Sequence, residues 1–265
     1  MESYLPVFLG LLTGLLLGLT GAGGGIMASP LLVLVMHQTV TQAAPVALIA
    51  VTVGAGVGML LGLREGIVRY RAALVLSTTG LLMTPLGIQC ARILPNAPLL
   101  VVFAFLLAYL GLRYLGRNPV VPDKQPVCAI DLQSGRFIWN WRCARIMLGI
   151  GALAGFLSGL LGVGGGFVLV PALRRHTTLP MRSVTATSLM VLTVVSSGGW
   201  LQWLAMGHVH WGIAVPFMAG MVLGMYLGRR WVHMVSETHL RRLFGIMCLI
   251  VSVGLLVRVS LHSLG

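Results

Sequence analysis

A glycine-rich segment occurs twice in the sequence and decides how the chain is interpreted. It reads GAGGGIMASP at residues 21–30 and GVGGGFVLVP at residues 162–171, an offset of 141 residues. Both copies have the form Gly-x-Gly-Gly-Gly with a proline after four more residues. Consecutive glycines oppose a continuous helix, because each costs about 1 kcal/mol in helix propensity relative to alanine. The two segments therefore predict two breaks between apolar helical stretches.

The same offset aligns the sequences around the two segments without a gap. The aligned pairs include Gly10 with Gly151, Gly14 with Gly155, Gly18 with Gly159, and Thr52 with Thr193. A fixed register over most of two half-chains predicts an internal duplication.

The composition is that of a membrane protein. Hydrophobic residues make up 57% of the chain, charged residues 9%, and the mean hydropathy is +0.96, which excludes an ordinary soluble domain. Ten apolar runs, five in each half, lie at about residues 5–20, 26–36, 43–63, 72–91, 97–112, 146–161, 167–173, 184–206, 211–228 and 243–257. We therefore expect an all-α polytopic membrane protein of two homologous repeats, whose glycine-broken helices meet near the centre.

The second run of each half is short. A membrane-spanning helix needs about 20 residues, and runs 26–36 and 167–173 are too short to span alone. They either cross with help from the glycine segments or turn back as re-entrant elements.

A polar stretch separates the halves and divides the chain into a first transmembrane repeat (1–116), a linker (117–145) and a second repeat (146–265). If all ten runs cross, nearly every arginine falls on one side, in loops 64–71, 113–145, 174–182 and 229–242. The positive-inside rule then predicts inverted repeats, a cytoplasmic linker and both termini outside. These flanking arginines account for the net charge of +13. We therefore expect a lipid bilayer and no nucleic acid as partner, and we allow for a homodimer.

The four cysteines fall into two groups. Cys90 and Cys248 lie in or beside apolar runs, whereas Cys128 and Cys143 flank the polar linker. Their spacing matches no metal-binding or redox motif, so we expect free thiols, with a linker disulfide as the alternative.

The glycine segments predict an anion site. A helix that restarts after such a break exposes free N–H groups and the positive end of its dipole, and two such ends meeting at the midplane would form one central pocket. The candidates from the motifs are Gly23, Gly24, Gly25, Pro30, Gly164, Gly165, Gly166 and Pro171. The alternative is close helix packing, which we expect for Gly10, Gly14 and Gly18.

Hydroxyl groups could add donors to this pocket. Thr187, Ser188 and Thr193 interrupt the run at 184–206, and Thr52 is the partner of Thr193 at the repeat offset. Such hydroxyls either contact a substrate or bond the carbonyl of the preceding turn. Arg174, Arg175 and Arg182 follow the second motif and either collect anions at the cytoplasmic mouth or anchor the loop at headgroups.

The acidic residues exclude other functions. All five (Glu2, Glu65, Asp123, Asp131 and Glu237) lie at a terminus or in a loop. Cation transporters and proton relays usually need a carboxylate inside the membrane, so we expect a small anionic substrate. His208-x-His210 lacks a third ligand, and no acid pair or catalytic triad is present; we expect no metal, no cofactor and no enzyme activity.

The two glycine motifs, with Ala186-Thr187-Ser188-Leu189 after the second, resemble the TauE/SafE sulfite exporter family over nearly the whole chain. The resemblance implies a multi-pass transporter of the bacterial inner membrane that moves sulfite, sulfoacetate or related organosulfonates outward. One departure is that Val46 and Ala47 stand where the repeat would match Thr187 and Ser188, which makes the polar lining one-sided. The alternatives are a membrane assembly or sensor subunit and a permease for another small ion.

Overall fold

The computed structural model describes residues 4–21, 23–116, 128, 140–207, 209–231 and 237–263, and this part of the chain is helical. The first half contains α1 (Tyr4–Thr20), α2 (Gly23–Val35), α3 (Val40–Arg64), α4 (Tyr70–Ile93) and α5 (Asn96–Leu115). The second half contains α6 (Trp141–Leu161), α7 (Gly166–His176), α8 (Met181–Ala205), α9 (Trp211–Trp231) and α10 (Glu237–Ser263). Each predicted apolar run lies in its own helix, to within a few residues, so the all-α prediction is confirmed.

Seven of the described helices are long and apolar enough to cross a membrane. The short runs form α2 and α7, with 13 and 11 residues. At a rise of 1.5 Å per residue these helices are about 20 Å and 17 Å long, against a hydrocarbon core of about 30 Å. Neither can span the membrane by itself.

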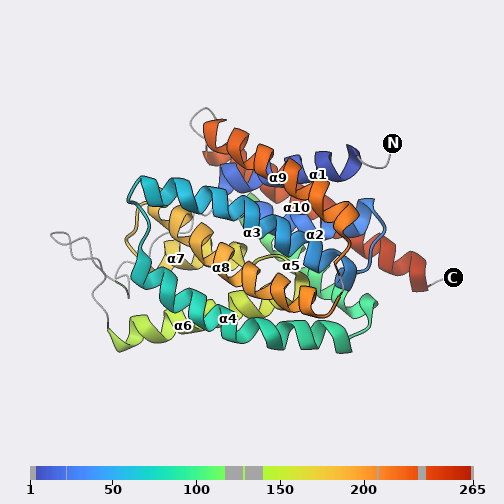
Figure 1. Cartoon of the computed structure of the whole chain (residues 1–265), viewed down its shortest axis with the longest axis horizontal. Coiled ribbons are helices and arrows are strands. Elements are labelled where there is room, and N and C mark those ends of the chain that lie inside the picture. The colour runs from blue at the N-terminus through green and yellow to red at the C-terminus, as the bar shows by residue number, and fades with distance from the viewer. Residues whose placement is uncertain are drawn as a thin grey trace.

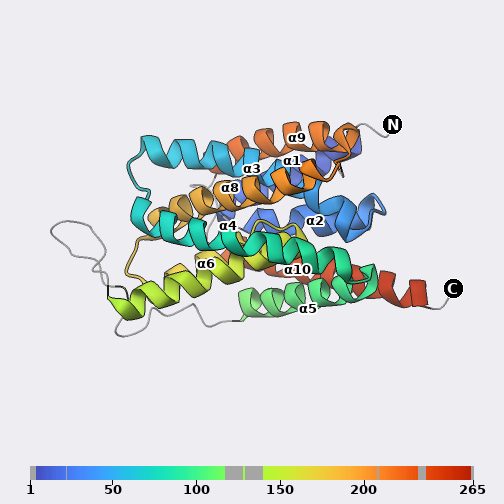
Figure 2. The same cartoon turned by 60° about the horizontal axis from the view of Figure 1, so that its bottom comes forward.

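Helices from the two halves pack against each other throughout the bundle (Figures 1 and 2). α1 lies along α9, α6 lies along α4, and α3 packs on α8 in the centre, while α5 and α10 pair beside this group. The first helix of each half thus packs on the fourth helix of the other half.

The glycines spaced by four residues make these contacts possible. A Cβ on Gly10, Gly14 or Gly18 would collide with the backbone of α9 at Phe217, Met221 and Met225 respectively. On α6, Gly151, Gly155 and Gly159 meet the backbone of α4 at Leu76, Gly80 and Thr84 in the same way. The predicted packing role of Gly10, Gly14 and Gly18 is confirmed.

Nearly all described arginines gather at one end of the bundle. In both views α1 begins and α10 ends on the right, whereas α6 begins on the left. The helix directions place the following residues at the left end, which we call the basic end: Arg64, Arg69, Arg71, Arg113, Arg142, Arg145, Arg174, Arg175, Arg182, Arg229, Arg230, Arg241 and Arg242. Arg92 and Arg258 lie toward the opposite end. The compartment that the basic end faces stays a prediction.

The cysteine prediction was wrong for one pair. Cys128 and Cys143 form a disulfide, with 5.2 Å between their Cα atoms, while Cys90 and Cys248 are free. The N–H of Cys128 donates to the carbonyl of His176 at 3.1 Å, which holds Cys128 at the end of α7, beside the start of α6. Because this proximity arises from contacts distant in sequence, the spacing of the cysteines did not reveal it.

The helix contact predicts the effect of a single methyl group. Gly14→Ala should lower the thermal unfolding temperature of the purified protein in detergent, since overpacking against the α9 backbone costs about 1–3 kcal/mol. Gly149→Ala is the matched control, because a Cβ at Gly149 of α6 meets no atom within 4 Å. Equal unfolding temperatures for the two variants would contradict the packing role.

Candidate functional site

The second glycine motif breaks the chain between α6 and α7 as predicted. Gly162 ends α6 in the left-handed conformation (φ 70°), and Gly164 and Gly165 follow with φ of 72° and 71°. Gly165 is the N-cap residue of α7 and leaves its first turn without a side-chain cap. A Cβ on Gly165 would also collide with the carbonyl of Ala154. Glycine is therefore required here both for the backbone conformation and for the close contact.

The first motif differs, because the predicted break does not extend through its three consecutive glycines. α2 already begins at Gly23, so Gly24 and Gly25 belong to its first turn, and the left-handed residue is Gly21 (φ 75°). A Cβ on Gly24 would collide with the backbone of Thr13 and Leu17 in α1. Close packing between α1 and α2 thus explains why the glycines lie inside the helix rather than before it.

The structure brings the two motifs together between α3 and α8. A Cβ on Gly25 would lie 3.2 Å from the carbonyl oxygen of Val163 in the second motif. Gly25 and Gly164 also share neighbours, since both face the side chains of Val51 and Leu192. Pro30 and Pro171 lie further along, inside α2 and α7.

The predicted hydroxyl residues have different surroundings. Thr52 and Thr193 donate to the carbonyls of the preceding turns, at 2.7 Å and 2.8 Å, which matches the alternative interpretation. The hydroxyl of buried Thr187 accepts the N–H of Arg69 at 3.1 Å, at the start of α4. Ser188 is fully buried, and its Oγ has no hydrogen-bond partner among the residues that the structure describes.

Ser196 was not among the predicted site residues. A Cβ on Gly164 would lie 2.9 Å from its Oγ, and within the described part of the chain this buried oxygen also has no hydrogen-bond partner. An unpaired hydroxyl therefore faces the glycine turn before α7. Only the folded chain reveals this, because Ser196 is separated from Gly164 by most of α7 and α8.

A cavity of about 480 Å³ opens at the basic end, within the range typical of small-molecule sites. Its charged residues are five arginines and one carboxylate: Arg113, Arg174, Arg182, Arg229, Arg241 and Glu65. Its remaining wall is mainly apolar and includes Leu19, Ile67, Leu110, Tyr114, Met181, Leu240 and Phe244. We call this cavity the arginine pocket. An excess of cationic groups around a concave apolar wall attracts anions.

The pocket contains only part of the predicted site. Pro171, Arg174 and Arg182 line it, whereas Arg175 is exposed and outside its lining. Neither the glycines of the two motifs nor Thr187 and Ser188 belong to its lining. Arg113, Arg229 and Arg241 were missed because each ends or begins an apolar run, where headgroup anchoring is the usual explanation.

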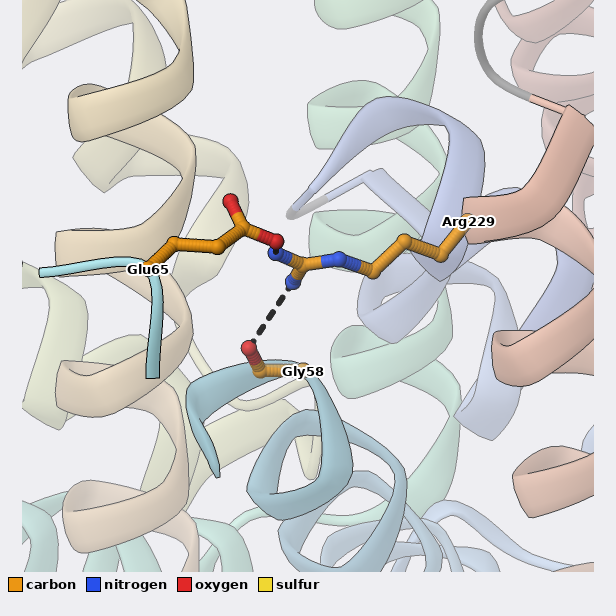
Figure 3. A network of polar contacts seen from close by, with 3 residues as sticks. All are labelled: Gly58, Glu65 and Arg229. Atoms are coloured by element: carbon orange, nitrogen blue, oxygen red, sulfur yellow. Dashed lines mark hydrogen bonds and ion pairs between the residues drawn. The ribbon is translucent and has the colours of Figure 1, made fainter. Parts of the chain in front are cut away.

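Arg229 is held by two partners from α3 and the residue after it (Figure 3). Its Nη1 donates to the carbonyl of Gly58 at 2.9 Å, and its Nη2 donates to Oε1 of Glu65, also at 2.9 Å. Glu65 is the C-cap residue of α3. This contact links α3 to the end of α9 at the edge of the pocket.

The residues that the structure describes include no group of three His, Cys, Asp or Glu side chains placed to hold a metal ion. The arginine pocket offers positive charge, and the glycine turn before α7 offers backbone hydrogen-bond donors. Both features suit an oxyanion.

The comparison with protein families decides the class. The family model for the sulfite exporter TauE/SafE matches residues 6–255. The chain belongs to the TauE/SafE family. A relative from Xylella fastidiosa, named "Probable membrane transporter protein", is 29% identical over 253 residues and covers 93% of this chain and 92% of the relative.

Other TauE/SafE relatives carry similar names. "Probable membrane transporter protein YunE" of Bacillus subtilis is 25% identical, over 86% of this chain and 88% of the relative's own length. "Probable membrane transporter protein MJ0441" of Methanocaldococcus jannaschii is 32% identical over 34% of this chain and 37% of its own. No solved structure matches. The chain is a multi-pass membrane transporter of this family.

The glycine turn yields a prediction that separates backbone strain from collision. Gly165→Ala should destabilise the protein more than Gly66→Ala, because both glycines have positive φ but a Cβ at Gly66 meets no atom within 4 Å. The strain alone costs about 1–2 kcal/mol, and overpacking adds about 1–3 kcal/mol. Thermal unfolding of both variants checks the order, and an equal loss would show that the contact with Ala154 carries no cost.

Proposed function

We propose that this TauE/SafE transporter exports sulfite or a related small sulfur-containing anion, such as sulfoacetate, and that the arginine pocket receives the anion from the cytoplasm. The observation that carries the proposal is the set of five arginines facing one carboxylate in a single cavity. A cation would be repelled there, whereas a small oxyanion gains charge-assisted hydrogen bonds from more than one guanidinium.

The glycine turn before α7 supplies a second, deeper position. Its support is the uncapped first turn of α7, the positive end of that helix dipole, and the unpaired hydroxyl of Ser196. In this proposal the anion moves from the arginine pocket along α7 to this turn. Ser188, also buried and unpaired, offers another donor on α8.

The proposed mechanism is alternating access between two inverted repeats. Its support is the reciprocal packing of the two halves, in which α1 packs on α9 and α6 packs on α4. The membrane potential then expels the anion, with about 2.3 kcal/mol per charge per 100 mV. All five acidic residues of the sequence fall outside the predicted apolar runs, which supports a coupling that needs no proton relay.

We propose that the basic end faces the cytoplasm, since arginine-rich loops are retained there. The bond between Cys128 and Cys143 lies at the same end. Disulfides in the cytoplasm are usually transient or redox-sensing, so in this orientation the bond would respond to the redox state of the cell.

Flux through liposomes tests the transport function. Purified protein should produce saturable sulfite flux, and Arg174→Gln should raise the half-saturating concentration about tenfold, because one charge-assisted contact in the pocket is lost. Arg71→Gln is the control, since Arg71 is exposed at the same end and outside the pocket lining. Absence of saturable flux of sulfite or sulfoacetate would favour an assembly or sensor subunit instead.

The single lysine of the chain tests the orientation. Lys124 lies in the linker, so a membrane-impermeant amine reagent should modify it in inverted vesicles and leave it unmodified in intact cells. Mass spectrometry of the linker peptide separates this signal from the amino terminus. Labelling in intact cells would place the linker and its disulfide in the oxidising compartment and reverse the proposed orientation.

A further inference from the structure

The contact between Glu65 and Arg229 lies in the arginine pocket, where Glu65 is the only carboxylate among the lining residues. We propose that Glu65 is a built-in competitor of the substrate: its carboxylate occupies Arg229 in the empty pocket and is displaced when an oxyanion binds. The inference rests on the proposed anion transport and goes beyond it, because it assigns Arg229 as a substrate-binding residue and Glu65 as the residue that sets the affinity.

Arg229 is built to remain in place when Glu65 leaves. Its Nη1 donates a hydrogen bond to the carbonyl of Gly58 at 2.9 Å, while its Nη2 donates to the carboxylate of Glu65. Figure 3 shows the two contacts on separate nitrogens of the guanidinium. Loss of the carboxylate therefore frees one donor without freeing the side chain.

Glu65 is held far less firmly than Arg229. Its side chain is 51% exposed, against 21% for Arg229, and only its Oε1 makes the contact. Exposed ion pairs contribute little net free energy, because water and salt compete for both charges. An anion that contacts Arg229 and a second pocket arginine at once can therefore replace the carboxylate.

The local structure gives no other reason for an acid at this position. Glu65 caps the carboxyl end of α3, where the helix dipole disfavours negative charge. Its cap contact to α3 uses the backbone N–H and not the carboxylate. The Arg229 contact accounts for the carboxylate.

The repeat does not carry a second copy of this pair of residues. At the repeat offset of 141, the positions corresponding to Glu65 and Arg229 are Met206 and Ile88, which cannot form an ion pair. The resident carboxylate thus lowers the affinity for the substrate at the arginine pocket. The substrate class that fits is an oxyanion with several oxygens on one charged group, since its separate oxygens can each accept charge-assisted hydrogen bonds from a different guanidinium.

The test is a double-mutant cycle read as binding affinity. The full-length protein in detergent is titrated calorimetrically with sulfite, and with chloride as the single-atom probe. The Kd for sulfite should be two- to fivefold lower for Glu65→Gln than for the wild-type protein. Arg229→Gln should weaken sulfite binding, and adding Glu65→Gln to it should produce no gain, because the contested donor is absent. Asp131→Asn in the linker is the control for the loss of one negative charge.

The outcomes separate this inference from the proposed function. The competitor role is overturned if the sulfite Kd of Glu65→Gln is unchanged or higher, or if the gain in affinity persists in the absence of Arg229. Binding of sulfite to the wild-type protein would still support the anion site. A lower unfolding temperature without a lower Kd assigns the pair a structural role only. Glu65→Ser replaces Glu65→Gln if the latter does not fold. Wild-type protein that binds neither sulfite nor sulfoacetate overturns both proposals.

Discussion

Direct backbone contact between helices is the constraint on which the rest of the structure depends. In lipid, helices gain little from burying apolar side chains, so association relies on close packing and on small residues. The glycines of α1 meet the backbone of α9, and those of α6 meet the backbone of α4. These contacts join the two halves, and the α1–α2 contact at Gly24 keeps the short helix α2 inside the bundle. The short helices and the pocket follow from them.

The position of the arginine pocket is a consequence of the short elements. α1 ends at Thr20, and Gly18, Leu19 and Thr20 line the cavity. The short helix α7 contributes Pro171 and Arg174 to the lining, and the α5–α10 pair contributes Tyr114 and Phe244. These short helices and the longer helices around them enclose the cavity. Its wall is apolar because the walls are membrane helices, and its rim is basic because those helices end in arginines.

In the proposed mechanism, two kinds of anion contact are combined along α7. At its carboxyl end the arginine pocket offers full charges near water, and at its amino end the glycine turn offers backbone N–H groups and an unpaired hydroxyl in a buried setting. Charges suit the entrance, where water reduces their desolvation cost. Dipoles suit the interior, where a full positive charge without a partner would be expensive. The Glu65 carboxylate at the entrance keeps one of the charges neutralised when no substrate is present.

The amino-acid sequence by itself determined the membrane class, the positions of ten helices, the packing role of Gly10, Gly14 and Gly18 and the grouping of the arginines, because hydropathy and helix spacing are local properties of the chain. Its repeated glycine motif also carried the family resemblance. Only the tertiary structure decided that α2 begins at Gly23, that Cys128 pairs with Cys143, and that Arg229 and Glu65 meet across 164 residues. Each of these depends on a contact between two separate segments of the folded chain. Such contacts are set by which helices pack together, and residue patterns within a single helix carry no record of its partner.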